Sequence, residues 1–352
     1  MYPRLRIDTA KYRHNVQTLQ KLCHKHGLSM MAVTKVFCAD QRLVDIINEL
    51  EVDYIADSRI MNLRRMKTDR KKVLLRIPSL HEVDEVVLFT DVSLNSEMKT
   101  IKALNKSAKY QDTVHDIILM VDIGDLREGV YYKESVMSMI TDIQALRHIN
   151  LKGIGTNLTC YGGVVPNQDT LKKLTDIVRL AKDTLGVTFD IISGGNSSHL
   201  HLLYKNASID AVNNLRIGEA LILGRETAFG KPLDDLYQDV VTLEADLIEM
   251  KQKPSIPEGD IGMDAFGKTP VFEDFGLMQR GILALGKQDV DFHELIPEDT
   301  NVRLIGSSSD HIIADLSNTS TPYKLGDVLR FRLSYGSLLS LMTSRYVEKS
   351  YV

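Results

Sequence analysis

The chain has 352 residues, of which 43% are hydrophobic and 26% charged, and its formal net charge is −4. This composition is ordinary for a globular protein, the length suits one large and one smaller domain, and the weak acidity argues against a nucleic-acid partner. The longest apolar runs are too short to span a bilayer, and no apolar signal segment opens the sequence, so no membrane partner is expected. Three cysteines, Cys23, Cys38 and Cys160, cannot all pair. They fit a cytoplasmic protein in which they serve as small apolar residues.

The first two thirds of the sequence alternate short apolar runs with amphipathic stretches. A helix is predicted over 9–26, and it ends at Gly27, a typical stop residue. Brief runs rich in Val, Ile and Leu follow, which is typical of strands buried on both faces. These predicted strands cover 29–33, 53–56, 73–77, 91–94, 117–121, 151–156, 189–192 and 215–217. Amphipathic helices are predicted between them, over 41–50, 97–106, 134–147 and 169–185.

Eight strand–helix units in a row favour one α/β architecture, a (β/α)8 barrel of the TIM type, over an open doubly wound sheet. Asn95-Ser96 and Asn167 stand where caps of two of the helices are expected.

After about residue 230 the helical pattern becomes scarce. Separate strands are predicted over 240–250, 280–284, 302–305, 311–316 and 328–333, divided by turn signals. We therefore predict a barrel over 9–229 followed by a C-terminal β domain over 230–352. The N-terminal residues 1–8 are expected to add a strand to that β domain.

Candidate functional residues stand at the ends of the predicted strands, where barrel enzymes carry their active sites. Lys35 follows the first strand. A desolvated lysine has a lowered pKa and supplies the neutral amine that a Schiff base needs, although a plain surface lysine is the alternative. The Gly-rich segment 194–198 follows the seventh strand, where barrels often bind phosphate. Arg216, Gly218 and Glu219 follow the eighth strand, and an ordinary salt bridge is the alternative for the arginine.

The loop after the fifth strand, over 121–129, contains two glycines and several charges. Asp122 and Asp125 are possible metal ligands, but no further His or carboxylate stands at a spacing that supports a site. We therefore expect no metal.

Taken together, these segments resemble the alanine racemase family, the fold type III enzymes that use pyridoxal phosphate (PLP). The resemblance rests on Ala32-Val33-Thr34-Lys35, Val121-Asp122-Ile123-Gly124 with Arg127, Asn196-Ser197 and Arg216-Ile217-Gly218, which occur in the family's order. The sequence is most similar to the subgroup that includes ornithine racemase. The features of that subgroup are Ala56-Asp57-Ser58-Arg59, Thr156-Asn157-Leu158 and Cys160-Tyr161-Gly162-Gly163.

The resemblance implies a PLP-dependent racemase that interconverts the L and D forms of a free amino acid. Ornithine or another basic amino acid is the expected substrate, and alanine stays open. Lys35 and Arg127 are the implied catalytic residues. The implied cofactor-binding residues are Lys35, Asn157, Ser197, Arg216, Gly218 and Glu219. The resemblance also implies a homodimer in which the partner subunit completes the active site.

The sequence departs from the family at three positions. The tyrosine four residues after the PLP lysine is Ala39, and the histidine of the sixth strand is Asn157. The segment over 282–289 lacks the tyrosine that serves the family as second catalytic base. Candidates for that second base are Asp310, His311 and Tyr161.

Three other functions compete with racemisation. A non-catalytic PLP carrier is the first, although such carriers are single barrels without a β domain. A fold type III decarboxylase is the second, although it needs a carboxylate near the place of Arg216. A barrel that binds another phosphate compound and no PLP is the third.

Overall fold

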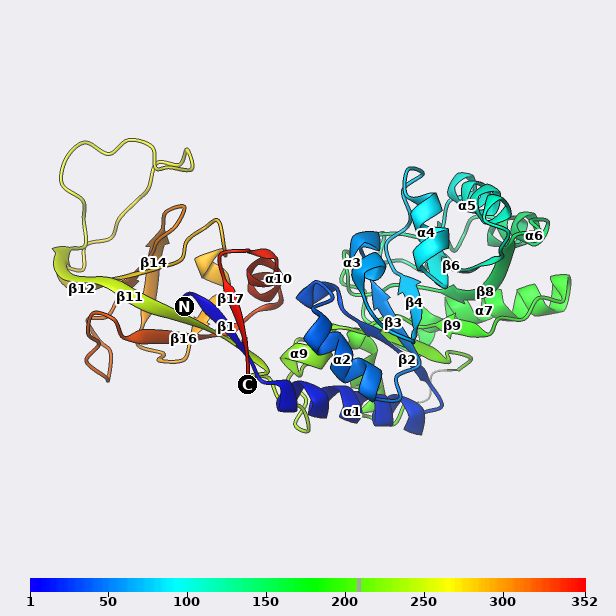
Figure 1. The fold of residues 1–352 in the computed structure, drawn as a ribbon, viewed down its shortest axis with the longest axis horizontal. Helices are drawn as coiled ribbons and strands as arrows, with labels where there is room; N and C mark the ends of the chain where they lie inside the picture. The colour runs from blue at the N-terminus through cyan, green and yellow to red at the C-terminus, as the bar shows by residue number, and fades with distance from the viewer. Residues whose placement is uncertain (208–209) are drawn as a thin grey trace. The chain divides into compact units, whose positions relative to one another are not determined.

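The computed structural model describes residues 1–207 and 210–352, which form two compact units (Figure 1). One unit is Lys11–Gln238, and the other combines Met1–Ala10 with Asp239–Val352. The first unit contains most of α1 (Thr9–Lys25) and the following elements: β2 (Ser29–Val33), η1 (Lys35–Phe37), α2 (Gln41–Glu49), β3 (Tyr54–Asp57), α3 (Ile60–Arg65), β4 (Lys71–Leu74), α4 (Val83–Phe89), β5 (Val92–Asn95), α5 (Met98–Tyr110), β6 (His115–Asp122), β7 (Val130–Tyr131), α6 (Val136–Gln144), β8 (Ile149–Gly155), α7 (Gln168–Leu185), β9 (Ile191–Ser193), η2 (Ser197–His199), α8 (Leu200–Leu203), β10 (Asn214–Ile217) and α9 (Glu219–Leu223).

The first unit is a closed parallel barrel. Its strands run in the order β5-β4-β3-β2-β10-β9-β8-β6, and pairing of β5 with β6 closes the ring. Helices lie outside the strands, as Figure 1 shows. The predicted TIM-type barrel is therefore confirmed, and each of its eight strands overlaps a predicted run.

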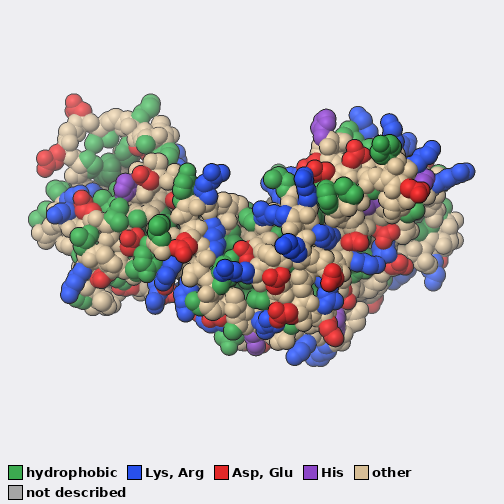
Figure 2. Space-filling view, viewed as in Figure 1, with side chains coloured by type: hydrophobic (Ala, Val, Ile, Leu, Met, Phe, Trp, Pro, Cys, Tyr) green, Lys and Arg blue, Asp and Glu red, His purple; other side chains and the backbone are tan. Residues whose placement is uncertain are grey.

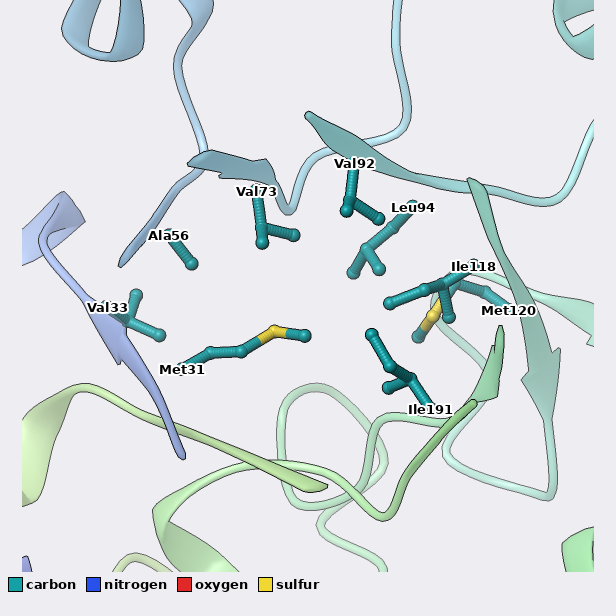
Figure 3. Packing of buried hydrophobic residues seen from close by; sticks show 9 residues of the cluster. All are labelled: Met31, Val33, Ala56, Val73, Val92, Leu94, Ile118, Met120 and Ile191. Carbon is teal, nitrogen blue, oxygen red and sulfur yellow. The ribbon is translucent and has the colours of Figure 1, made fainter. Parts of the chain in front are cut away.

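The interior of the barrel is filled by apolar side chains that point toward one another (Figure 3). The buried cluster is Met31, Val33, Ala56, Val73, Val92, Leu94, Ile118, Met120 and Ile191. Because apolar side chains fill the interior, a functional site of this barrel is expected among the polar side chains at the ends of the strands.

Two predicted helix caps have different outcomes. Asn167 caps α7, and its side-chain oxygen accepts a hydrogen bond of 2.8 Å from the Thr170 N–H. Asn95 does not cap α5, because it belongs to β5 and pairs with β6, while its amide donates to Ser93. The helix begins instead at Met98.

The second unit is an antiparallel sheet with a parallel edge. Its elements are β1 (Arg4–Ile7), β11 (Val241–Pro254), β12 (Leu277–Leu283), η3 (Phe292–Glu294), β13 (Leu295–Pro297), β14 (Arg303–Ser307), β15 (Ile312–Asp315), β16 (Val328–Leu333), α10 (Tyr335–Thr343) and β17 (Glu348–Tyr351). The main path runs β13-β16-β11-β12-β15-β14. Strand β1 pairs with β11 on one side and, in parallel, with β17 on the other, so the N-terminal strand is part of this sheet.

The division between the units falls after Gln238, beyond the boundary predicted at residue 230. The segment before it packs on the barrel. Asn15 and Tyr237 exchange two hydrogen bonds of 2.8 and 2.9 Å, and the Leu233 N–H donates to the Gly224 carbonyl. These contacts hold the segment to α1 and to the end of α9.

The visible face of the molecule mixes both signs of charge. Figure 2 shows Lys and Arg side chains interspersed with Asp and Glu over that face. Within 1–207 and 210–352, no helix has both the length and the apolarity that crossing a bilayer requires.

Candidate active site

Lys35 lies directly after β2, at the start of the 3-10 turn Lys35–Phe37. The preceding residue, Thr34, is buried, and its hydroxyl donates to the Asp57 carboxylate at 2.6 Å. Burial lowers the pKa of Lys35. Cys160, Asp57 and Glu128 oppose this effect, and Arg127 adds to it. Because its pKa is lowered overall, Lys35 populates the neutral amine form more than an ordinary lysine does at the same pH.

Asp57 fixes the turn that carries Lys35. Besides the Thr34 hydroxyl, its carboxylate accepts the Arg59 N–H at 2.9 Å and the Asn62 amide at 3.0 Å. Burial raises the pKa of Asp57, and the hydrogen bonds reduce that rise. The carboxylate is therefore committed to positioning the turn.

Arg216 is almost fully buried at the end of β10. Its Nη1 donates to the Ser193 Oγ at 2.5 Å, and its Nη2 donates to the Thr156 carbonyl at 2.6 Å and the Asn157 Oδ1 at 2.7 Å. Burial lowers the pKa of Arg216 to about 10. The guanidinium therefore stays charged at neutral pH, and these bonds use three of its five N–H donors.

Asn157 connects Arg216 to the loop after β6. The side-chain amide of Asn157 donates to the Glu128 carboxylate, which in turn accepts from Arg127 Nη2 at 2.6 Å. The four side chains Arg127, Glu128, Asn157 and Arg216 therefore form one continuous chain of hydrogen bonds. Three of them were predicted from the sequence. Glu128 was missed, and its position beside Arg127 was the only signal that pointed to it.

The segments after β9 and β10 form a glycine-lined cradle. Gly195 has a φ of +131°, and a Cβ there would lie 2.8 Å from the His199 ring. The backbone N–H groups of Gly218 and Ala220 reach the Ser197 Oγ at only 3.4 Å, so they remain available to a stronger acceptor.

Two orphaned hydroxyls make this region suitable for a phosphate-bearing cofactor. Thr156 Oγ1 and Ser198 Oγ are buried and have no hydrogen-bond partner among the described residues. A buried hydroxyl without a partner costs free energy, and a phosphate oxygen is an acceptor that could satisfy it. Glu219 contributes no carboxylate to the cradle, because that group pairs with Arg225 at 2.7 Å.

Asp125 organises the loop after β8. Its two carboxylate oxygens accept four backbone N–H groups, each at 3.0 Å, from Thr159, Cys160, Tyr161 and Val164. The described residues contain no group of His, Cys, Asp and Glu side chains that could hold a metal ion. The four hydrogen bonds from backbone N–H groups make Asp125 a structural acceptor, a role that the sequence could not distinguish from that of a ligand.

We predict that Asp125→Asn lowers the free energy of unfolding by about 3 kcal/mol at pH 7, because charge-assisted hydrogen bonds are lost from a buried group. Burial raises the pKa of Asp125, but the backbone N–H groups lower it by more, so it lies below its usual value. A depressed pKa stabilises the fold above the usual aspartate pKa of about 3.9, and this stabilisation is lost as the pH falls through the folded-state pKa.

Urea unfolding at several pH values checks this prediction. The difference between wild type and Asp125→Asn should shrink toward zero in acid, whereas exposed Asp183→Asn should show no difference at any pH. An equal stability of the Asp125 variant at pH 7 would contradict the structural role.

The three residues considered for the second base lie in unlike surroundings. The Tyr161 side chain is 77% exposed. Asp310 and His311 belong to the other unit and pair with each other at 2.9 Å.

Cys160 was expected to be a small apolar residue, but it is exposed. Its Sγ accepts the Asn196 amide at 3.2 Å, and it interacts electrostatically with Lys35.

The alanine racemase N-terminal domain model matches residues 7–226. The chain is 47% identical over 350 residues to the ornithine racemase of Acetoanaerobium sticklandii, covering 99% of both chains. It is 37% identical to the lysine racemase of Thermotoga maritima, covering 100% of this chain and 99% of that one. The alanine racemase of Bartonella henselae, solved with covalently bound pyridoxal phosphate, superposes with a TM-score of 0.75 at 16% identity and 99% coverage of each chain, which shows a shared fold.

The chain belongs to the alanine racemase family.

Proposed function

We propose that this protein racemises ornithine with PLP held by Lys35. The chain is a PLP-dependent amino-acid racemase, as its family and its full-length similarity to two racemases establish. The observation that carries the assignment of the site is the hydrogen-bonded chain of Arg127, Glu128, Asn157 and Arg216, together with a lysine whose pKa is lowered.

The residues present fit this cofactor. Lys35 would hold it covalently, and the cradle of Ser197 with the Gly218 and Ala220 N–H groups would hold its phosphate. Three of the five N–H donors of Arg216 bond to other described residues. The remaining two would be available to the ring nitrogen of the cofactor, and the hydrogen bond to Asn157 would hold the guanidinium in position. Glu219 would contribute through its backbone, since its carboxylate is paired. When bound, PLP supplies electron withdrawal that acidifies the α-proton of the amino acid.

Lys35 would move that proton. Its lowered pKa favours the neutral form of the amine, the form that can accept the α-proton on one side of Cα. Arg127, whose side chain is 40% exposed and is paired with Glu128, would hold the substrate carboxylate near the cofactor.

Arg216 would limit side reactions. Because its pKa of about 10 keeps the guanidinium protonated, it does not transfer a proton to the ring nitrogen. A ring nitrogen without a proton withdraws electrons less strongly, so return of the α-proton is favoured over transamination or decarboxylation.

Ornithine is favoured as substrate because the ornithine racemase shares more of the sequence than the lysine racemase does. Lysine is the second candidate for the same reason.

We also infer a homodimer from the resemblance of the sequence to its family, and a cytoplasmic location from its cysteine content. Light scattering of the purified protein would then give twice the chain mass of 39.6 kDa.

The test is inversion of single L-amino acids in the presence of PLP, followed by chiral chromatography. Ornithine is expected to be inverted fastest, lysine more slowly and alanine slowest. Failure to invert any amino acid would overturn the proposed reaction, and faster inversion of alanine than of ornithine would overturn the proposed substrate.

A further inference from the structure

A row of charged side chains crosses one face of the sheet in the second unit, where strands β1, β11 and β16 are neighbours (Figure 1). Arg4 of β1, Glu244 of β11 and Arg330 of β16 are opposed in the register of these strands. Opposed residues of paired strands point to the same face, so the three side chains lie side by side. The next residues along the three strands are buried on the other face: Leu5, Leu243 and Phe331.

Glu244 orients both arginines from the middle of the row. It is 2% exposed, and its two oxygens accept hydrogen bonds from Arg4 Nε at 2.6 Å and from Arg330 Nε at 3.2 Å. The Arg4 guanidinium also lies over the Tyr2 ring, 4.8 Å from its centre. The Nη atoms of the two arginines bond to no described residue. Each guanidinium is therefore held at Nε and presents its pair of Nη groups, an edge that matches a carboxylate.

The charged row lines a cavity of about 570 Å³, within the range of about 300–1,000 Å³ that is usual for small-molecule sites. All of the lining residues belong to the second unit. Glu298 follows β13, and its N–H donates to the Arg330 carbonyl at 2.9 Å, which places it beside the row. Its carboxylate forms no hydrogen bond or ion pair with any other residue that the structure describes. The cavity therefore combines oriented guanidiniums with an available carboxylate.

The charges of the lining select among small ligands. The lining contains two guanidiniums and three carboxylates, those of Glu244, Glu298 and Asp299, and Asp299 also accepts the Tyr323 hydroxyl at 3.4 Å. Phosphate or a dicarboxylate would add negative charge to a wall that is already negative. A diamine would leave the Nη groups without an acceptor. A diamino acid supplies one carboxylate for the arginines and ammonium groups for the carboxylates, and its net positive charge complements the wall.

We propose that this cavity is a second binding site for a basic α-amino acid, formed by residues other than those around Lys35. The α-carboxylate accepts hydrogen bonds from the Nη groups of Arg4 and Arg330, and an ammonium group donates to Glu298. This inference goes beyond the proposed racemisation and does not depend on it, because the lining residues all lie in the second unit. The second unit would then bind the class of compound that the proposed reaction uses.

The test counts and locates ornithine bound to the PLP-loaded enzyme. Racemisation leaves the total amount of ornithine unchanged, so equilibrium dialysis against radiolabelled DL-ornithine can be used with the active enzyme. We expect two bound molecules per chain in the wild type. Arg330→Ala should weaken one of the two sites by about tenfold or more, because hydrogen bonds to a charged group are lost. In hydrogen–deuterium exchange, ornithine should protect peptides covering 298–303 and 320–330 in addition to peptides of the barrel.

Arg332→Ala is the matched control, because Arg332 is an exposed arginine two residues further along β16 and outside the cavity lining. It should keep both sites at wild-type affinity. Glu298→Gln preserves the size of the side chain but removes its charge, so it should weaken the second site by about tenfold and leave the protection of barrel peptides unchanged. Circular dichroism and the visible absorbance of the bound cofactor show that each variant is folded and loaded.

A single bound ornithine per chain, with protection confined to barrel peptides, would overturn the second site. Unchanged protection of 298–303 and 320–330 in Arg330→Ala would overturn it as well. Stronger protection of these peptides by phosphate or glutamate than by ornithine would overturn the proposed class of ligand. Protection of 298–303 and 320–330 without protection of the barrel would support the second site and contradict the proposed substrate, so the two failures are distinguishable.

Discussion

Replacing Lys35 with alanine is expected to lower the rate of ornithine inversion by about 10³-fold or more, because both the covalent anchor and a general base are lost. The same variant should lose the visible absorbance of the lysine-bound cofactor. Chiral chromatography and an absorbance spectrum of the PLP-treated protein measure the two effects. Since Lys35 follows the barrel strand β2 and is outside the apolar cluster, the variant should remain folded.

Lys67→Ala is the matched control, because Lys67 is an exposed lysine after α3. It should retain wild-type inversion and absorbance. If Lys35→Ala kept a tenth or more of the activity, the anchor would have to be another lysine of the chain.

Replacing Arg216 with glutamate is expected to lower inversion by about 10²-fold, the lower end for loss of a positioned catalytic group, and to raise the share of side products. A carboxylate near the ring nitrogen can share a proton with it, which strengthens electron withdrawal. The measurement is the ratio of α-keto acid and decarboxylated amine to inverted ornithine, by chromatography and mass spectrometry. An unchanged ratio and rate would show that Arg216 does not act at the ring.

Arg216→Lys separates charge from stability. Glutamate removes the donors to the Thr156 carbonyl and to Asn157 Oδ1, and each buried group left unpaired costs about 1–3 kcal/mol. Lysine keeps a cation and one donor head, so it should lose rate without gaining side products. Thermal unfolding of both variants measures the stability part separately.

The barrel and much of the site could be predicted because of one physical regularity. Strands buried on both faces give continuous apolar runs, and the ends of parallel strands meet at one rim. Lys35 and Arg216 were proposed on this ground, and Asn157 on the resemblance to the family. The structure joins Asn157 and Arg216 through a direct hydrogen bond.

The side-chain partners could not be predicted, because they depend on how loops from distant strands meet. Glu128 accepts a hydrogen bond from Asn157, which follows a different strand. Glu219 forms an ion pair with Arg225, six residues later in the chain. In the sequence, a loop aspartate such as Asp125 looks the same whether it binds a metal or accepts hydrogen bonds. The four backbone N–H groups that donate to it are visible only in the structure. For Cys160, sequence alone does not distinguish a packed thiol from an exposed one.

The position of β1 determines when the β unit can be completed. Residues 11–238 are continuous, so the barrel can fold as soon as they have been synthesised. Strand β1 is made first, yet it lies between β11 and β17, and β17 is made last. At about 5–20 residues per second, β1 waits roughly half a minute for its second neighbour, with the apolar Leu5 and Ile7 in need of cover. A nascent chain that stalls before residue 348 would therefore carry a finished barrel and an open, pairing-competent strand edge.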